Sequence, residues 1–203
     1  MYALIVNNEI KEIITNPKAM IIDDVQYPAK IFQLWSQAEL NAIGIYEVIT
    51  DSSNFKDKEY YINTNEKYNF SDNQVTKSWG TATPKRLEDE DAVDEDGNNI
   101  LDADGNQVIN YGLKTEKKRI VKQQASGLLA PTDWYVVKAT EVADYSVPEN
   151  VTTFRSDVRA KSNEMETQIN ACTNVDELKA LYEYTEQEDG TITRPLAEFP
   201  KEI

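Results

Sequence analysis

The first part of the chain predicts short β-strands, because apolar residues alternate with polar ones or gather in short runs. The stretch YALIVNNEIKEIIT is apolar on both sides of Asn7-Asn8. Asn tolerates the left-handed backbone that a two-residue hairpin turn requires, so we expect an opening hairpin. Between residues 51 and 85 the segments EYYIN, EKYNF and QVTKSWG are rich in aromatic and β-branched residues. These segments predict a meander of further short strands.

One short helix is expected among these strands. Ser36 and Glu39 stand three residues apart and match a capping box, and Gly44 follows where a short helix would end. The pattern therefore predicts a helix over residues 37–43. The segment IYEVIT, which follows directly, predicts a strand that leads back to the sheet.

From Leu113 onward the apolar residues recur at helical spacing until Gly127 and Pro131. The stripe of this first amphipathic helix consists of Leu113, Ile120, Val121, Ala125, Leu128 and Leu129. Thr132 is then in position to cap a following turn that contains Trp134.

A second long helix is predicted to start near Pro148, where Ser146 and Glu149 match another capping box. Its apolar stripe is Phe154, Val158, Met165, Ile169 and Cys172. A shorter helix is expected from Val175 to Tyr184. The last residues contain Gly190, Pro195 and Pro200 and predict an extended tail rather than a packed element.

Together these patterns predict an α+β protein in four parts. Residues 1–86 form a small antiparallel β-rich N-terminal domain with a short helix. Residues 87–112 form an acidic linker or β-hairpin, in which DEDGNNI and DADGNQVI repeat one Asp-Gly-Asn turn. Residues 113–185 form a helical domain that resembles an αα-hairpin, and residues 186–203 form the extended C-terminal tail.

Charge and composition narrow the range of partners. The 203 residues include 36 Asp and Glu against 21 Lys and Arg, so the net charge of −15 repels nucleic acid and anionic membranes from the molecule as a whole. No apolar run approaches the roughly 18–20 residues that span a bilayer. Cys172 is the single cysteine, so no intrachain disulfide can form, and a reducing compartment is the expected setting.

Candidate chemistry is scarce. The chain has no His, which removes the commonest general base near neutral pH and the commonest zinc ligand. Gly-rich phosphate loops, Gly-x-Ser-x-Gly and Cys/His combinations are absent. We expect no enzyme activity, no metal site and no cofactor, with an enzyme that uses carboxylates and a metal ion as a distant alternative.

The acidic stretch invites a calcium interpretation that its spacing does not support. Seven of the nine residues from Glu88 to Asp96 are acidic. An EF-hand loop with its required Gly at Gly97 would place Ala92 and Ala103 at the first and last ligand positions. A solvated loop with Asp-Gly turns is the favoured interpretation. The basic segment KTEKKRIVK lacks the interleaved aromatics of a nucleic-acid site, and we expect it to face the acidic loop or an acidic partner.

The stretch from Gly112 to Ile169 resembles the C-terminal region of the tail-fibre or tail assembly chaperone-like proteins of tailed bacteriophages. In that family a helix ends in Leu-Leu, Thr-Asp-Trp follows, and a Val-Pro-x-x-Val segment leads into a helix with an aromatic-Arg pair and a second Arg. The matching positions are Leu128, Leu129, Thr132, Asp133, Trp134, Val147, Pro148, Val151, Phe154, Arg155 and Arg159. The front part is similar more loosely, through its Ser-capped helix, the segment from Gly44 to Val48 and the motif VTKSW.

The resemblance implies a non-enzymatic phage tail protein that acts by protein–protein binding. Members of the family are implied to help fibre or tail subunits fold and trimerise, so the implied partner is a tail fibre or another tail protein. The implied location is the host cytoplasm during assembly, and a homo-oligomer is possible. The alternative is a structural component of the virion, such as an adaptor, baseplate or fibre-associated protein that stays in the tail.

Within this resemblance, Trp134 and Arg155 are expected to belong to the interior geometry of the helical domain. Trp134 would pack over the end of the preceding helix, and its replacement by Ala would then lower thermal stability. Arg155 or Arg159 is expected to pair with Asp133. We expect the partner surface on the strand-rich front or on the last tail.

Overall fold

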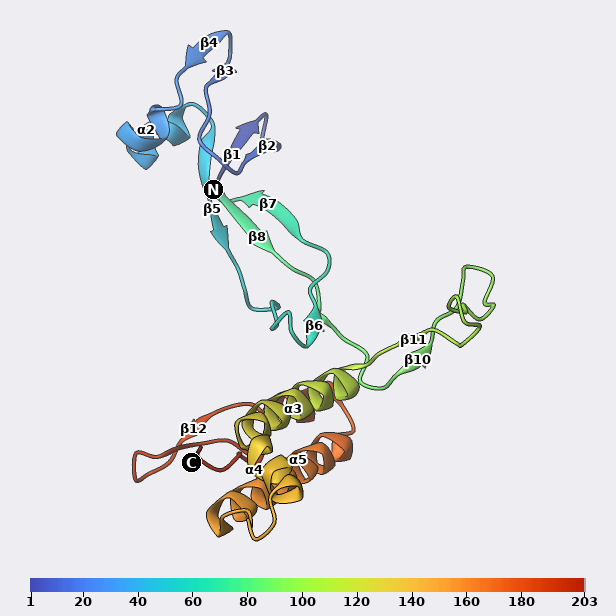
Figure 1. Ribbon diagram of the computed structural model, residues 1–203. Helices are drawn as coiled ribbons and strands as arrows, with labels where there is room; N and C mark the ends of the chain where they lie inside the picture. The colour runs from blue at the N-terminus through green and yellow to red at the C-terminus, as the bar shows by residue number, and fades with distance from the viewer. Residues whose placement is uncertain (203) are drawn as a thin grey trace. The chain divides into compact units, whose positions relative to one another are not determined.

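The computed structural model describes residues 1–202 and consists of two compact units, Met1–Thr83 and Pro84–Ile203. Strands gather in the first unit and the long helices in the second, so the predicted α+β class is confirmed (Figure 1). The sequence placed the end of the β-rich part at residue 86, and the division between the units lies at β9 (Thr83–Pro84).

A five-stranded sheet with the order β2-β1-β5-β8-β7 forms the first unit. Its strands are β1 (Tyr2–Val6), β2 (Glu9–Ile14), β5 (Ile45–Thr50), β7 (Lys67–Ser71) and β8 (Gln74–Ser78). Neighbouring strands are antiparallel except β5 and β8, which are parallel. Of the strands predicted as a meander, β7 and β8 pair antiparallel as expected, whereas the segment EYYIN does not pair with them and the parallel pair departs from the expected antiparallel domain. Parallel neighbours need a crossover of about a dozen residues or more, and the chain between β5 and β8, which includes β6 (Tyr61–Ile62), supplies it.

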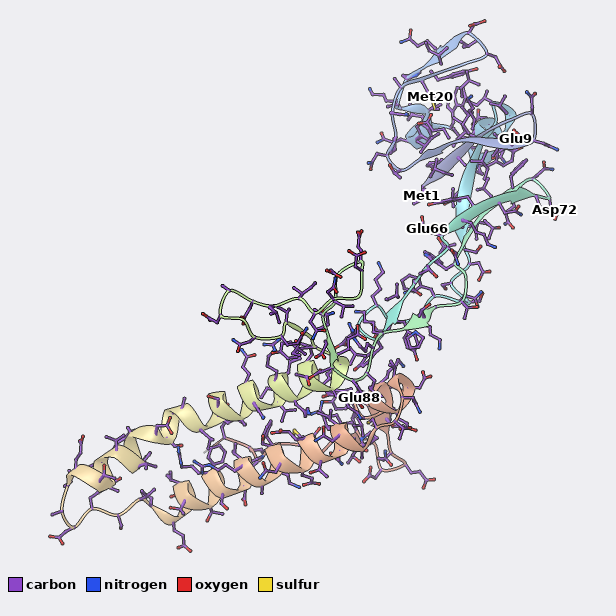
Figure 2. All side chains as sticks on the ribbon, turned by 90° about the vertical axis from the view of Figure 1, so that its right-hand side faces the viewer. Met1, Glu9, Met20, Glu66, Asp72 and Glu88 are labelled. Carbon is purple, nitrogen blue, oxygen red and sulfur yellow. The ribbon has the colours of Figure 1, made fainter. Side chains whose placement is uncertain are left out.

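Three hairpins in this unit close through pairs of Asn or Asp residues with left-handed backbone. The pairs are Asn7-Asn8 between β1 and β2, Asp23-Asp24 between β3 (Met20–Ile22) and β4 (Val25–Tyr27), and Asp72-Asn73 between β7 and β8. Figure 2 shows Asp72 at the tip of its hairpin. Left-handed backbone at both central residues gives the turn whose twist matches paired strands, so the predicted opening hairpin is confirmed.

Two short helices, α1 (Ile31–Leu34) and α2 (Gln37–Ala42), cover the core of the first unit. The predicted capping box is confirmed, because the Ser36 hydroxyl accepts a hydrogen bond from the Glu39 amide while the Glu39 carboxylate accepts one from the Ser36 amide. The helix ends before Gly44, as predicted. The core consists of Leu4, Ile14, Met20, Ile22, Ile31, Phe32, Leu40 and Ile45.

The second unit begins with the acidic ribbon. Its strands β10 (Glu90–Asp91) and β11 (Ile109–Asn110) pair antiparallel. Between them the backbone turns at Gly97 and again at Gly105, both with positive φ. The side chains of Asp94 and Asp102 accept backbone hydrogen bonds within these turns, so the two repeated segments fold in the same way.

Helices α3 (Leu113–Leu129) and α5 (Glu149–Ala171) lie side by side and run antiparallel (Figure 1). The 3-10 turn η1 (Ala130–Thr132) and helix α4 (Asp133–Glu141) connect them, and α6 (Val175–Ala180) follows. The predicted stripe of the second long helix is confirmed, because all five of its side chains are buried.

The predicted stripe of the first long helix is wrong in part. Ile120 is 38% exposed, whereas Lys114 and Lys117 are buried. Lys114 forms an ion pair with Glu88, which Figure 2 shows at the start of α3. The Lys117 ammonium lies 4.3 Å from the centre of the Tyr182 ring. Because each charged head has a partner, the aliphatic stems pack in the interior as apolar residues would.

The expectation of an unpacked tail over residues 186–203 is also wrong for residues 186–202, and residue 203 lies outside the described residues. The strands β12 (Thr185–Glu186) and β13 (Ile192–Thr193) form a small hairpin. After it, Leu196 is only 2% exposed, and Phe199 packs on the helices. The prolines stop this segment from joining a helix or a sheet, but they do not prevent its side chains from being buried.

Candidate functional site

Residues from both halves of the predicted motif meet at the corner between α3 and α4. From α5, Arg155 Nη1 donates hydrogen bonds to the Leu129 carbonyl at 3.0 Å and to the Thr132 hydroxyl at 2.6 Å. The same nitrogen lies 2.8 Å from Asp133 Oδ1. Arg155 is 8% exposed and Thr132 6%. The predicted pairing of an arginine with Asp133 is therefore made by Arg155, and Arg155 belongs to the interior as expected.

The local sequence explains why this corner needs an arginine. Pro131 lies in the 3-10 turn, where the Asp133 amide bonds to the Ala130 carbonyl instead of continuing the α-helical pattern. The Leu129 carbonyl is left for other donors, and it accepts the Thr132 hydroxyl at 2.7 Å as well as Arg155. A buried carbonyl that lacked these donors would destabilise the fold by about 1–3 kcal/mol.

Two predicted caps are not formed. The Thr132 side chain makes no capping bond to α4, because its hydroxyl is already engaged with Leu129 and Arg155. At α5 the N-cap residue is Pro148, and no side chain caps the helix. Ser146 therefore lies two residues too early to cap it, and the predicted box with Glu149 is wrong.

The apolar motif residues lie beneath the corner. Leu128 and Leu129 are half-buried and pack on a cluster made of Ala125, Phe154 and Val158. The first turn of α5 adds Val151 to the buried set. These positions hold α3 against α5 and make the corner a fixed platform for α4.

Trp134 lies outside this interior, contrary to the sequence-based prediction. Its side chain is 51% exposed, and none of the side chains of α4 is buried. Its ring lies next to Tyr135, with centroids 3.8 Å apart. We call the exposed apolar side chains of this helix and its end, which are Trp134, Val136, Val137 and Val142, the α4 face.

The exposure of the α4 face could have been predicted from the sequence, although the motif alone did not indicate it. Four consecutive apolar residues, 134–137, stand in a nine-residue helix. Successive residues of a helix are about 100° apart, so four in a row surround it and some must point away from the core.

A hollow of about 420 Å³ opens beside the α4 face. It is lined by Val136, Val147, Thr152, Arg155, Ser156 and Arg159. Arg159 Nη1 donates to the Arg155 carbonyl at 3.2 Å, and among residues 1–202 Arg159 has no ion-pair partner. The only charged residues in the lining are the two arginines, so this hollow combines two valines with positive charge in a strongly acidic chain.

Among the titratable groups elsewhere in the second unit, Asp94, Asp102 and Cys172 have pKa values that the structure shifts. Hydrogen bonds from the backbone amides of Asn98 and Asn106 hold the pKa values of Asp94 and Asp102 below their usual range. Burial raises the pKa of the Cys172 thiol, which disfavours its reactive thiolate form. Within residues 1–202, no three His, Cys, Asp or Glu side chains are grouped so that they could hold a metal ion.

No known protein family, curated protein or solved structure matches the chain. The described helices include none that is both long and apolar enough to cross a membrane. The motif residues and their surroundings form two surface features, the α4 face and the arginine-lined hollow next to it.

Proposed function

We propose that this protein is a tail assembly protein of a tailed bacteriophage, which binds a tail fibre subunit and assists its folding without catalysing a reaction. Two things support the proposal. The first is the resemblance of residues 112–170 to the tail-fibre assembly chaperone-like family. The second, and the observation that carries it, is the α4 face, where Trp134 and Val137 are each 51% exposed.

A short helix without buried side chains is unusual in an isolated protein. Helices shorter than about 12–15 residues are marginal in water, and most of their stability comes from packing an apolar face. Helix α4 has nine residues and buries none of them. Trp134 and Val137 lie three residues apart, on the same side of α4, and both are half-exposed. Exposed apolar side chains that lie side by side mark interaction sites, so a partner that covers these two would add to the packing of α4.

The α4 face is held in place before binding. Arg155 ties the residues immediately before and at the start of α4 to α5 through three contacts of 3.0 Å or less. A partner therefore does not have to order the helix when it binds, which lowers the entropic cost of association. Aromatic residues and arginine are enriched where interfaces gain most of their energy, and Trp134 and Arg159 flank this region.

The test is binding of the tail fibre subunit of the same phage by the wild type and by Trp134→Ser, measured by isothermal titration of the separately purified proteins. We expect Trp134→Ser to weaken binding by at least about 30-fold, as loss of a hot-spot aromatic does. Its melting temperature should stay within about 2 °C of the wild type, because surface substitutions change stability little. Val25→Ser also replaces a half-exposed apolar side chain with Ser, but in the first unit; it is the control and should leave binding unchanged.

Unchanged binding by Trp134→Ser would refute the role of the α4 face. A large fall in its melting temperature would show that Trp134 acts in packing, as the sequence alone indicated. Quantitative mass spectrometry of purified particles separates assembly from a structural role. We expect the protein to be absent or far below the copy number of the tail proteins, whereas a fixed symmetric number would make it a virion component.

A further inference from the structure

After β13 the chain bends at Pro195 and Leu196 and lies in a groove of the helical unit without forming a helix or a strand. We call residues 195–201 the C-terminal strap; Figure 1 draws this part of the chain in dark red. Leu196 is almost fully buried, and Phe199 packs on Ala125, Phe154 and Val158, which belong to α3 and α5. The strap thus covers apolar side chains that would otherwise face solvent.

The groove holds the strap largely through its backbone. Gln168 Nε2 donates to the Pro195 carbonyl at 3.1 Å, and Gln168 Oε1 accepts the Ala197 amide at 2.8 Å. The Leu196 amide donates to the Leu181 carbonyl at 3.0 Å. One side-chain amide therefore binds the backbone on both sides of Leu196. Such contacts are open to any extended segment that has an amide at the Ala197 position.

Side chains add a defined pattern to these backbone contacts. Leu196 and Phe199 are the two apolar anchors, three residues apart. Further along, Pro200 and Lys201 line a hollow of about 440 Å³ together with Glu149, Asn150, Thr153, Phe154 and Asp157. Glu149 and Asp157 give this end of the groove a negative charge that suits a basic residue.

The length of the strap matches the helix that it follows. From Leu196 to Lys201 an extended chain covers about 17 Å, and from Gln168 back to Asp157 an α-helix covers about 17 Å. The strap thus runs antiparallel to α5, with one contact region at Gln168 and another near Asp157. This is the geometry of a peptide in a groove.

We propose that this groove is a peptide-binding site for an extended segment of a partner protein, and that the C-terminal strap occupies it until the partner displaces it. The segment carries an apolar residue, an aromatic residue three positions later, and then a basic residue. The strap of a second copy of this chain would compete poorly for the groove. It could make only the same contacts as the protein's own strap, which is tethered and therefore present at an effective concentration in the millimolar range. A partner segment with a better anchor overcomes that advantage. The inference does not depend on the α4 face or on the fibre subunit named above.

The test uses a fluorescent peptide with the sequence of residues 194–203, RPLAEFPKEI, and the full-length protein. In the variant Leu196→Ala/Phe199→Ala the tethered strap loses both anchors. We expect this variant to bind the peptide at least about tenfold more tightly than the wild type, because apparent affinity scales with the fraction of open groove. Glu202→Ala, at the exposed residue that follows the strap, is the control and should behave like the wild type.

Adding Gln168→Ala to the double variant should weaken peptide binding about tenfold, since two hydrogen bonds are lost. A second test measures the wild-type protein itself, so it does not depend on whether the variants fold. In hydrogen exchange, the Ala197 amide should exchange faster than the amides of Val158 and Ile169, because the strap opens while the helices stay folded.

Two results would overturn the proposal. Peptide binding that is no tighter in the double variant than in the wild type, although circular dichroism shows a folded protein, would mean that the groove is not a binding site. Exchange of the Ala197 amide at the same rate as the helix core would mean that the strap is a permanent part of the fold.

Discussion

Arg155 Nη1 lies 2.8 Å from the carboxylate of Asp133, yet the two side chains have different surroundings. The Arg155 side chain is 10% exposed and the Asp133 side chain 59%. Water screens the carboxylate, so the ion pair itself contributes little. The hydrogen bond of Arg155 to Thr132 is buried and that to the Leu129 carbonyl is partly buried, so water screens them less. These two bonds therefore contribute most of the stability that Arg155 provides.

This difference predicts unequal effects of removing the two partners. Arg155→Ala should lower the free energy of unfolding by about 2–3 kcal/mol, because it removes two hydrogen bonds from a charged donor and leaves the Leu129 carbonyl with the Thr132 hydroxyl alone. Asp133→Asn should cost less than about 1 kcal/mol. Urea denaturation of both variants measures the difference. Equal losses would show that the ion pair, rather than the buried hydrogen bonds, dominates.

Two glycines with nearly the same backbone should respond differently to Ala. Gly44 has φ +80° and Gly97 has φ +83°. A Cβ on Gly44 would lie 2.6 Å from the Ile5 carbonyl oxygen, whereas a Cβ on Gly97 meets nothing within 4 Å. Both substitutions should cost about 1–2 kcal/mol for the left-handed backbone. Gly44→Ala should cost about 1–3 kcal/mol more, because strand β1 has to move. Calorimetry of the two variants tests this, and equal costs would contradict the clash.

Acid should loosen the start of α3 through Asp89. A hydrogen bond from the Gly112 amide, at 2.8 Å, and another from the Thr115 hydroxyl hold the pKa of Asp89 below its usual value. A lowered pKa gives stability that is fully present above the unfolded value of about 3.9 and is lost as the pH falls through the folded value. Asp89→Asn should therefore be less stable than the wild type at pH 7, and the gap should shrink below about pH 4.

Urea midpoints measured from pH 7 down to about pH 3 would follow that gap. Glu95→Gln removes a negative charge from the same acidic stretch and is the control for net charge. A gap for Asp89→Asn that stays constant across this range would contradict the assignment of the lowered pKa to Asp89.

Cys172 should be nearly inert in the folded protein. Its side chain is buried, burial raises the pKa of the thiol, and the sulfur donates to the Gln168 carbonyl at 3.4 Å. Reaction with Ellman's reagent should be at least about tenfold slower in buffer than in denaturant. Similar rates under both conditions would show that the end of α5 opens readily.

Features that depend on a few neighbouring residues could be predicted from the sequence. The Asn7-Asn8 turn and the Ser36–Glu39 capping box are set by residues at most three positions apart, and both are present. The stripe of α5 follows from helical spacing alone. Such features need no knowledge of what lies across the fold.

Features that depend on distant partners could not be predicted in this way. Lys117 is buried because Tyr182 lies over its ammonium, and Phe199 is buried because α3 and α5 form a groove for it. Trp134 is 51% exposed, because the described part of its unit buries none of the side chains of α4. The pattern of polar and apolar residues along the chain does not determine whether these three side chains are buried or exposed. In each case the burial depends on residues that are distant in sequence.

The three Asn and Asp turns of the first unit also bear on how the chain folds during synthesis. Each joins two strands that are consecutive in sequence, so each hairpin can close within microseconds as soon as its residues leave the ribosome. The parallel pairing of β5 with β8 has to wait until the β7–β8 hairpin has emerged. The pairing of β5 with β8 joins the β2-β1-β5 strands to the β8-β7 hairpin, so it is the step that completes the sheet.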